Sequence, residues 1–453
     1  MKKNLSSGSV LKTIICFALP YILSYFLQTL YGMADLFIVG QFNGVDGITA
    51  VSNGSQVMYM LTVIVVGLAM GSTVIIGHEI GAKRLDKVAT TIGNTITLFM
   101  MVAIVIMGIL LLSVRHIVIL IGTPTEAING TINYLTICFI GIPFITAYNI
   151  ISSIFRGLGD SKSPMYFIGI SCILNIGLDY IFMGCFKLGP LGAALGTTLS
   201  QTISVIIALI TIKKRNIGIN LKKEDFILKK SVISEVLKIG IPVAVQDGCI
   251  QVAFIIITVI ANHRGLDDAA AVGIVEKVIS ALFIIPSSML ATVSAVSAQN
   301  IGAKKHDRAK KTLHYGIILT SIYGIIVALV IQLIASSVIN LFTKDTIVIL
   351  LGSQYIKSYI WDCIFAGIHF CFTGYFCAYG KSYIGFLHNI LAIILVRVPG
   401  SYYASKYFSN TLFPMGLAAP AGSLLSVIIC LIAYRWVKHS VLLKCEGEIL
   451  SKE

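Results

Sequence analysis

The 453-residue sequence has few charged side chains and almost no tryptophan. Asp, Glu, Lys and Arg together make up 12% of the residues, whereas an average soluble domain holds about a quarter. Hydrophobic residues supply 57% of the chain, and only two tryptophans are present. So little polar surface cannot cover a water-soluble globule of this length. The composition indicates a polytopic membrane protein and excludes catalytic folds that need a sizeable aqueous domain.

Motifs for metal or hydrolytic chemistry are also lacking. The ten cysteines include no CxxC pair, and the eight histidines form no HxxxH or HExxH pattern. No GxSxG occurs either, so zinc and serine-hydrolase chemistry have no support and the chain is not expected to be an enzyme. Most cysteines lie inside apolar runs and are expected to be small core residues.

The apolar runs are long enough to cross a bilayer. A crossing helix needs about 20 apolar residues, and twelve such windows can be placed on the chain. This predicts an all-α protein with twelve transmembrane helices, the first of which is retained rather than cleaved as a signal peptide. The windows cover residues 14–40, 53–78, 91–114, 128–151, 164–186, 191–212, 233–260, 271–298, 313–338, 347–372, 383–404 and 413–437.

Basic residues are distributed unevenly between the two sides of the membrane. The two termini and the even-numbered loops carry 25 Lys and Arg residues, and the odd-numbered loops carry five. By the positive-inside rule both termini are cytoplasmic. The net charge of +14 is thus explained by topology, and no nucleic-acid partner is expected.

The two halves of the chain repeat each other. IGAKRLDKVATT at 80–91 aligns with IGAKKHDRAKKT at 301–312, an offset of 221 residues. Pro20 and Pro242 open the two copies with nearly the same offset. Because each copy has six helices, both enter the membrane from one side, which predicts two lobes related by a pseudo-two-fold axis along the membrane normal. We expect an N-lobe at 1–212, a basic cytoplasmic linker at 213–231 and a C-lobe at 232–453.

Carboxylates at membrane depth point to function because their burial costs several kcal/mol. At 1.5 Å per residue, Asp35, Asp179 and Thr197 each lie about 10–13 Å from the outer end of their helices. Asn175 lies one turn before Asp179 and faces the same way. Three helices therefore place polar groups at one depth.

The second half lacks this pattern. Position 35 shifted by 221 is Ile256, and position 179 shifted by 221 is Gly400. We infer a site for a proton or Na⁺ in the N-lobe, since Na⁺ prefers hard oxygen ligands and a buried carboxyl group suits a proton. The alternative is that the aspartates serve helix packing alone. For Asp247, Glu276 and Asp362 packing is the favoured interpretation.

Two further groups could line a central cavity. Gln246 and Asp247 follow Pro242, where a bent helix frees carbonyl groups. Arg397, beside Pro399, is either a cavity cation or a structural partner of Asp362; the sequence does not decide between these roles.

The segments QTLYGMADLFIVG, IGAKRLDKVA, FRGLGDSKSPMY, NIGLDYIF, GPLGAALGTTLSQ and IPSSMLATVSAVSAQNIGAKKHDRA together resemble the MATE (multidrug and toxic compound extrusion) family. The resemblance covers both halves in order. It implies a twelve-helix exporter that exchanges organic cations or other amphipathic drugs for Na⁺ or H⁺.

The resemblance also assigns residues. Asp35 matches the family's helix 1 aspartate, with Pro20, Gln28 and Tyr31 at bend and lining positions. The helix 5 pair and the helix 6 threonine match Asn175, Asp179 and Thr197, and Asn149 matches a helix 4 asparagine approximately. In helix 7, where some branches carry an acidic residue, this chain has Ile250, so a C-lobe cation site of that kind is not expected.

Two other functions compete with drug export. A lipid-linked oligosaccharide flippase of the same superfamily would need several basic residues in its cavity, but only Lys238, Lys277, Lys357 and Arg397 lie within helices. A membrane-embedded transferase would need paired acidic metal ligands in loops. The expectation is an antiporter that acts as a monomer on small amphipathic molecules, in a bacterial plasma membrane, with H⁺ or Na⁺ as coupling ion and no cofactor.

Overall fold

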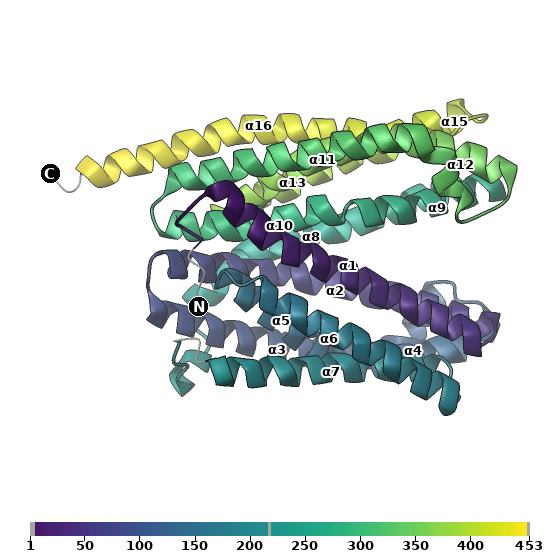
Figure 1. Cartoon of the computed structure of the whole chain (residues 1–453), viewed down its shortest axis with the longest axis horizontal. Helices are drawn as coiled ribbons and strands as arrows, with labels where there is room; N and C mark the ends of the chain where they lie inside the picture. Colours follow the sequence, from purple (N-terminus) through teal and green to yellow (C-terminus); the bar gives the residue numbers. More distant parts are fainter. Residues whose placement is uncertain (1–4, 216–218, 451–453) are drawn as a thin grey trace. The chain divides into compact units, whose positions relative to one another are not determined.

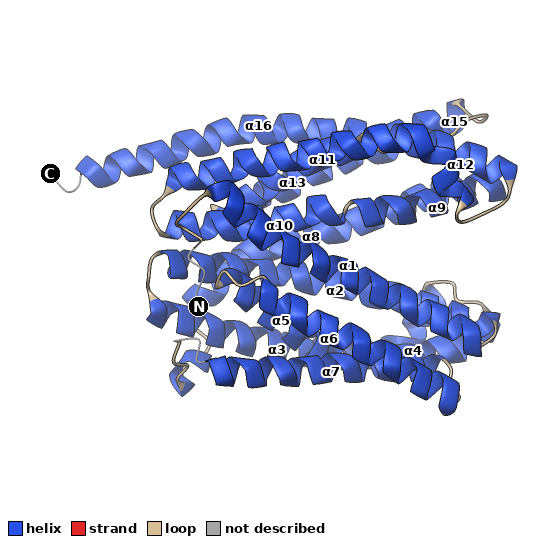
Figure 2. Ribbon diagram, viewed as in Figure 1, coloured by secondary structure: helices blue, strands red, loops and turns tan. Residues whose placement is uncertain are grey.

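The computed structural model describes residues 5–215 and 219–450, and the side chains of 215 and 438–450 are left out of the description. Cys445 and several basic residues counted for the topology, namely Lys2, Lys3, Arg215, Lys438, Lys444 and Lys452, lie outside the described side chains. In the described residues every regular element is helical, and short loops join the helices (Figure 2).

Figure 1 traces the helices in chain order. The first half contains nine elements: α1 (Val10–Phe42), α2 (Val45–Gly81), α3 (Leu85–Leu120), η1 (Thr125–Ala127), α4 (Ile128–Ile140), α5 (Ile142–Gly157), α6 (Lys162–Asp179), η2 (Tyr180–Cys185) and α7 (Pro190–Arg215). The short helix η3 (Lys223–Phe226) stands between the halves. The second half continues with α8 (Lys230–Asn262), α9 (Leu266–Leu282), α10 (Ile284–Gly302), α11 (His306–Asn340), α12 (Thr346–Tyr359), α13 (Asp362–Ala378), α14 (Ser382–Ala392), η4 (Ile393–Arg397), α15 (Val398–Tyr407) and α16 (Phe413–Leu450).

The twelve predicted windows each fall on one observed span, whole or broken. Ten helices in the described part of the chain are long and apolar enough to cross a membrane, and two bent pairs bring the number to twelve. The pairs are α4 with α5, bent by 50°, and α12 with α13, bent by 41°. Large apolar side chains such as Leu112 and Leu333, each 86% exposed, cover the helices as a lipid-facing surface requires.

The predicted windows missed the interruptions within these spans. The fourth breaks at Gly141 and the eighth at Phe283, and each break is followed within three residues by a proline, Pro143 or Pro286. Proline lacks an N–H and its ring collides with the carbonyl group four residues earlier, which explains both breaks. The break between α12 and α13 has no proline.

Backbone conformations repeat with the predicted offset of 221 residues. Lys83 and Lys304 both adopt a left-handed conformation, with φ of 60° and 58°. Gly159 and Gly380 do the same with φ of 88° and 68°. The turns that the sequence repeat predicted to correspond therefore also share their geometry.

The chain divides into two compact units, and the first unit also contains short segments from the second half of the sequence. Unit 1 contains Met1–Ala244 and Ala298–Arg308, and unit 2 contains Val245–Ser297 and Ala309–Glu453. Within unit 1 glycines let backbones approach closely. A Cβ on Gly71 would collide with the carbonyl oxygen of Val236, and one on Gly302 with that of His78.

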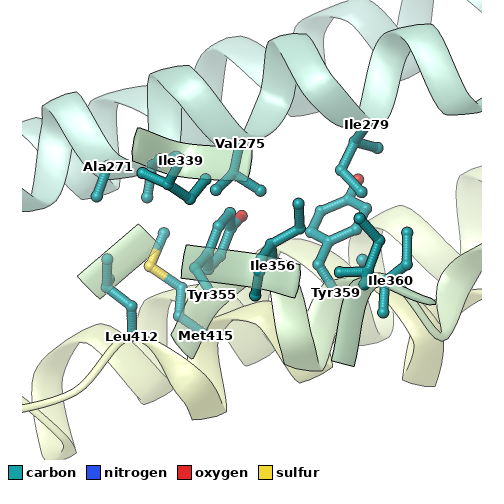
Figure 3. Packing of buried hydrophobic residues seen from close by; sticks show 14 of the residues in the cluster. Ala271, Val275, Ile279, Ile339, Tyr355, Ile356, Tyr359, Ile360, Leu412 and Met415 are labelled. Carbon is teal, nitrogen blue, oxygen red and sulfur yellow. The ribbon is translucent and has the colours of Figure 1, made fainter. Parts of the chain in front are cut away.

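Each unit has its own apolar core. In unit 1 the core includes Ile38, Val51, Leu135 and Phe139. In unit 2, Tyr355 and Tyr359 of α12 lie among side chains of α9 and α16 (Figure 3). The expectation of core cysteines is right for six of them, all buried, and wrong for Cys16 and Cys185, which are exposed.

Candidate functional site

Four polar side chains meet inside unit 1. Asp35 comes from α1, Asn175 and Asp179 come from the last turns of α6, and Thr197 comes from α7; α6 packs against both other helices. All four are buried, and Asp179 and Asn175 have no exposed surface. The structure thus joins residues that the sequence placed at one depth on three helices. We call these four residues the carboxylate cluster.

One hydrogen bond of the cluster joins two helices, and a second lies within α6. The Thr197 hydroxyl donates to Asp35 Oδ2 over 3.4 Å, and the Asn175 amide donates to Asp179 Oδ1 over 3.5 Å. The carboxyl groups of Asp35 and Asp179 also lie close enough to interact electrostatically. Two like charges this close repel when both are ionised, so a bound cation or proton would relieve the repulsion.

Several oxygen atoms of the carboxylate cluster have no donor. Asp35 Oδ1, Asp179 Oδ2 and Asn175 Oδ1 are buried, and none accepts a hydrogen bond from another residue that the structure describes. Within the same residues no Lys or Arg forms an ion pair with either aspartate. Buried acceptors without donors cost free energy, which a proton or a hard cation can recover. Carboxylate, amide and hydroxyl oxygens are also the ligand types that Na⁺ prefers.

Gly196 is a residue beside the carboxylate cluster that the sequence reasoning missed. It precedes Thr197 on α7, and a Cβ at this position would collide with Asp179 Oδ1. The glycine therefore leaves the space that Asp179 occupies. The only signal in the sequence was its position directly before the threonine.

The π-helix η2 begins directly after Asp179. Such π segments are rare and occur often at functional sites, because they shift side chains from the regular helical register. Here the segment ends the helix that carries both Asn175 and Asp179. The sequence alone gave no sign of it.

The remaining predicted residues of α1 lie along the same helix. Tyr31 interacts with Asp35, Asp179 and Thr197 and so belongs to the surroundings of the cluster. Gln28 is half-buried one turn earlier, and Pro20 is buried. The expected bend at Pro20 does not interrupt the helix, since α1 runs unbroken from Val10 to Phe42.

Asn149 is not joined to the cluster by any hydrogen bond in the described part of the chain. It is buried on α5, and its amide donates to the carbonyl oxygen of Ile145 over 2.8 Å in its own helix. This local bond uses one of the two N–H donors of the amide.

The other predicted cavity residues belong to unit 2. Gln246 is 1% exposed and its Oε1 accepts no hydrogen bond from a described residue. Asp247 interacts with Cys377 of α13. Arg397 ends the π-helix η4 and lines a cavity together with Asp362. In the described residues no group of three His, Cys, Asp or Glu side chains could hold a metal ion.

Comparison with known proteins identifies the class. The sequence model of the MatE family matches residues 20–181 and 242–403, one match in each half of the chain. The chain therefore belongs to the MatE family, and it is a membrane transporter with a two-lobe, all-helical fold.

Two named relatives align with this chain over most of their length. "Probable multidrug resistance protein YoeA" of Bacillus subtilis is 27% identical over 95% of each chain. "Multidrug export protein MepA" of Staphylococcus aureus is 24% identical over 89% of each chain. The family assignment extends over almost the whole molecule.

Solved structures share the fold. An outward-facing multidrug resistance MATE family transporter matches with a TM-score of 0.91 and 20% identity over 98% of this chain and 99% of that one. A MATE in the straight conformation matches with a TM-score of 0.89 and 21% identity over 97% and 98%. At this identity the likeness establishes the fold alone.

Proposed function

We propose that this transporter is a secondary active antiporter that exports amphipathic, often cationic small molecules in exchange for H⁺ or Na⁺. The observation that carries the proposal is the carboxylate cluster. It buries two interacting aspartates without a basic partner among the described residues and leaves three oxygen acceptors open. An arrangement of this kind is costly when empty and becomes stable when a small cation or proton occupies it.

Ion coupling follows from the difference in free energy between the ion-free and the occupied carboxylate cluster. The ion-free cluster carries repelling charges, and the occupied cluster does not, so occupancy changes the free energy of the surrounding helices by several kcal/mol. Asp35 belongs to α1 and Asp179 to α6, so the same ion bridges two helices. A ligand that binds one arrangement of these helices more tightly shifts the population toward it. Alternating occupation by ion and substrate then gives exchange by alternating access.

The substrate class is inferred from names and from composition. The relatives in Bacillus and Staphylococcus are named for multidrug resistance and multidrug export. Only four Lys or Arg residues lay within the predicted helices, which favours amphipathic cations over the pyrophosphate of a lipid-linked sugar.

The proposed setting is the plasma membrane of a bacterium, with both termini cytoplasmic and one chain as the working unit. The excess of basic residues supports the orientation. Three segments that this topology assigns to the same side of the membrane also meet: the N-terminal segment, the end of α5 and the turn after α10. Gln299 of α10 donates to the carbonyl oxygen of Gly157 over 2.9 Å, and Lys305 donates to that of Ser6 over 2.8 Å.

Transport in reconstituted vesicles tests the proposal. Purified protein in liposomes receives either a Na⁺ gradient or a pH gradient, and movement of a fluorescent organic cation is followed. One of the gradients should drive transport against the concentration of the dye. If dye movement follows only its own gradient under both conditions, the protein is not an antiporter of this kind.

A further inference from the structure

A second polar site lies wholly inside unit 2, in a cavity of about 60 Å³. Asp362 and His369 of α13 and Arg397 of η4 provide its titratable groups. Phe254, Phe283 and Phe370 provide three aromatic side chains at the same cavity. Further polar groups come from Asn389, Ser423 and Ser426.

The acidic group of this cavity is buried without a donor. Asp362 is 1% exposed and interacts with Arg397 and Ser423 of the same cavity, but neither of its carboxylate oxygens accepts a hydrogen bond of good geometry within the described residues. His369 is 4% exposed, and its Nδ1 is likewise buried and unbonded among them. Two side chains that line one cavity and keep open hydrogen-bonding atoms indicate a place for a ligand with donor groups.

The basic group is held in place by aromatic side chains. The Arg397 guanidinium lies over the rings of Phe254 and Tyr359, at 4.8 Å and 5.7 Å from the ring centroids. One of its terminal nitrogens donates to the Tyr359 hydroxyl, and Tyr359 is itself fixed in the core of unit 2 (Figure 3). Its Nε is buried and has no acceptor among the described residues. The cation is therefore positioned and keeps a free donor.

The two charges share the cavity and attract each other, but they form no close ion pair. In the described residues no ion pair within 4.0 Å joins Arg397 to Asp362. A further acidic residue, Glu276, also interacts with Arg397 and accepts a hydrogen bond from Thr258 over 3.3 Å. His388 lies beside His369, with ring centroids 5.3 Å apart, and is bonded to Thr373.

We propose that this cavity binds the head group of an amphoteric molecule, with a protonated amine on Asp362 and a carboxylate or similar anion on Arg397. A free anion would meet Asp362 and the nearby Glu276, and a free cation would meet Arg397. A molecule that carries both charges satisfies both groups at once. The π-helix η4 sets Arg397 at its last residue, as η2 follows Asp179 in unit 1.

The size of the cavity limits what enters it. A buried water needs about 10–15 Å³ of such space, so 60 Å³ holds an amine and a carboxylate rather than a whole drug. The head group would fill this space, so the apolar remainder of the ligand must extend past the three phenylalanines, whose rings favour flat partners. The ligand class is therefore an aromatic or otherwise apolar body with an amine and an acid close together.

Three naphthyl compounds that differ in whether they carry the amine, the carboxylate or both test the proposal by equilibrium dialysis on the purified full chain. 2-Naphthylalanine carries both charges, 2-(2-naphthyl)ethylamine the amine alone, and 3-(2-naphthyl)propionate the acid alone. We expect the amphoteric compound to bind about tenfold more tightly than either analogue, since each charged hydrogen bond contributes about 1.5–3 kcal/mol. Equal binding of the three, or no binding of naphthylalanine up to its solubility limit, would overturn the proposal.

Two substitutions assign the contacts. Asp362→Asn should weaken naphthylalanine about tenfold but strengthen the propionate, since it removes a repelling charge, and Arg397→Gln should likewise weaken naphthylalanine but strengthen the amine. Arg397→Lys keeps the charge and should restore part of the affinity, which controls for loss of packing. A preference for naphthylalanine that survives both Asp362→Asn and Arg397→Gln would place its binding elsewhere.

The binding measurement needs no gradient and no ion coupling. If the protein proves not to be an antiporter, the binding of naphthylalanine is therefore still a valid test of this cavity. If naphthylalanine does not bind, the proposed antiport is not affected.

Discussion

The Thr197 hydroxyl on α7 donates a hydrogen bond to Asp35 Oδ2 on α1, although 162 residues separate them. This bond joins the first helix of unit 1 to the last one before the linker. Asp179 on α6 interacts with the same carboxyl group. A change in the charge of Asp35 therefore alters interactions with residues on two other helices. A coupling site requires such a connection between helices.

Gly196→Ala should disable the site without removing a ligand. The added methyl group collides with Asp179 Oδ1, so the carboxylate must move from its place beside Asn175. We expect ion-driven transport to fall at least tenfold while the protein still inserts in the membrane. The initial rate of dye transport in proteoliposomes measures this effect.

Gly177→Ala is the matched control. Gly177 lies on α6 between Asn175 and Asp179, and a Cβ there meets no atom within 4 Å. The change should leave transport at the parental rate and stabilise the helix by about 1 kcal/mol at most. If both alanine variants transport normally, the space beside Asp179 is not critical.

Pro20→Ala should affect switching more than folding. The proline removes one backbone hydrogen bond within an otherwise continuous α1, which leaves the helix able to bend there. With alanine we expect expression and drug binding near the parental level, slower transport and a weaker dependence of drug binding on the ion. Parental transport with unchanged ion dependence would mean that α1 bending is not the coupling element.

Protonation of Asp225 should release the linker from α3. The backbone N–H of Lys222 and the hydroxyl of Thr90 each donate to its carboxylate over 2.9 Å, and these bonds lower the pKa of Asp225, the Lys222 bond most. Because the folded pKa lies below its ordinary value of about 3.9, the stabilisation is complete above that value and is lost as the pH falls through the lowered one.

A nitroxide attached at Glu224→Cys, with the exposed Cys16 and Cys185 replaced by serine, reports this release. Its spectrum should sharpen between about pH 5 and pH 2. Asp225→Asn should give the sharp spectrum at every pH. A spectrum that stays broad through acidification would show that Asn94, which donates to two linker carbonyl groups, suffices to hold the linker.

Cysteine labelling tests the orientation. Single cysteines placed at 222–229 should react only with a reagent added from the cytoplasmic side. Those placed at 264–268 should react only from outside, because the two segments lie at opposite ends of α8. Labelling of both segments from the same side would contradict the twelve-helix topology.

The sequence predicted the spans because a crossing helix must be apolar over a fixed length, and that requirement is local. It also predicted that Asp35, Asp179 and Thr197 meet, since depth along a helix follows from residue count. The hydrogen bond that ties Asn149 to its own helix was not predictable in this way. Side-chain choice between a local carbonyl group and a distant partner depends on three-dimensional packing.

Other features depend on contacts between distant segments. The π-helix after Asp179, the space left by Gly196 and the open hydrogen-bonding atoms around Asp362 have no periodic signal in the sequence. The role of Arg397 was left open for the same reason. In the structure it stacks on Phe254, which lies 143 residues earlier and was not connected to it by any motif.

Replacement of the two aspartates tests the coupling site most directly. Wild-type protein, Asp35→Asn and Asp179→Asn are reconstituted at equal density, and dye export is driven by whichever ion gradient drives the wild type. Each asparagine variant should fold and insert but lose ion-driven export, and glutamate at either position should retain a part. If both asparagine variants export dye at the wild-type rate under the gradient, the carboxylate cluster does not couple ion to substrate.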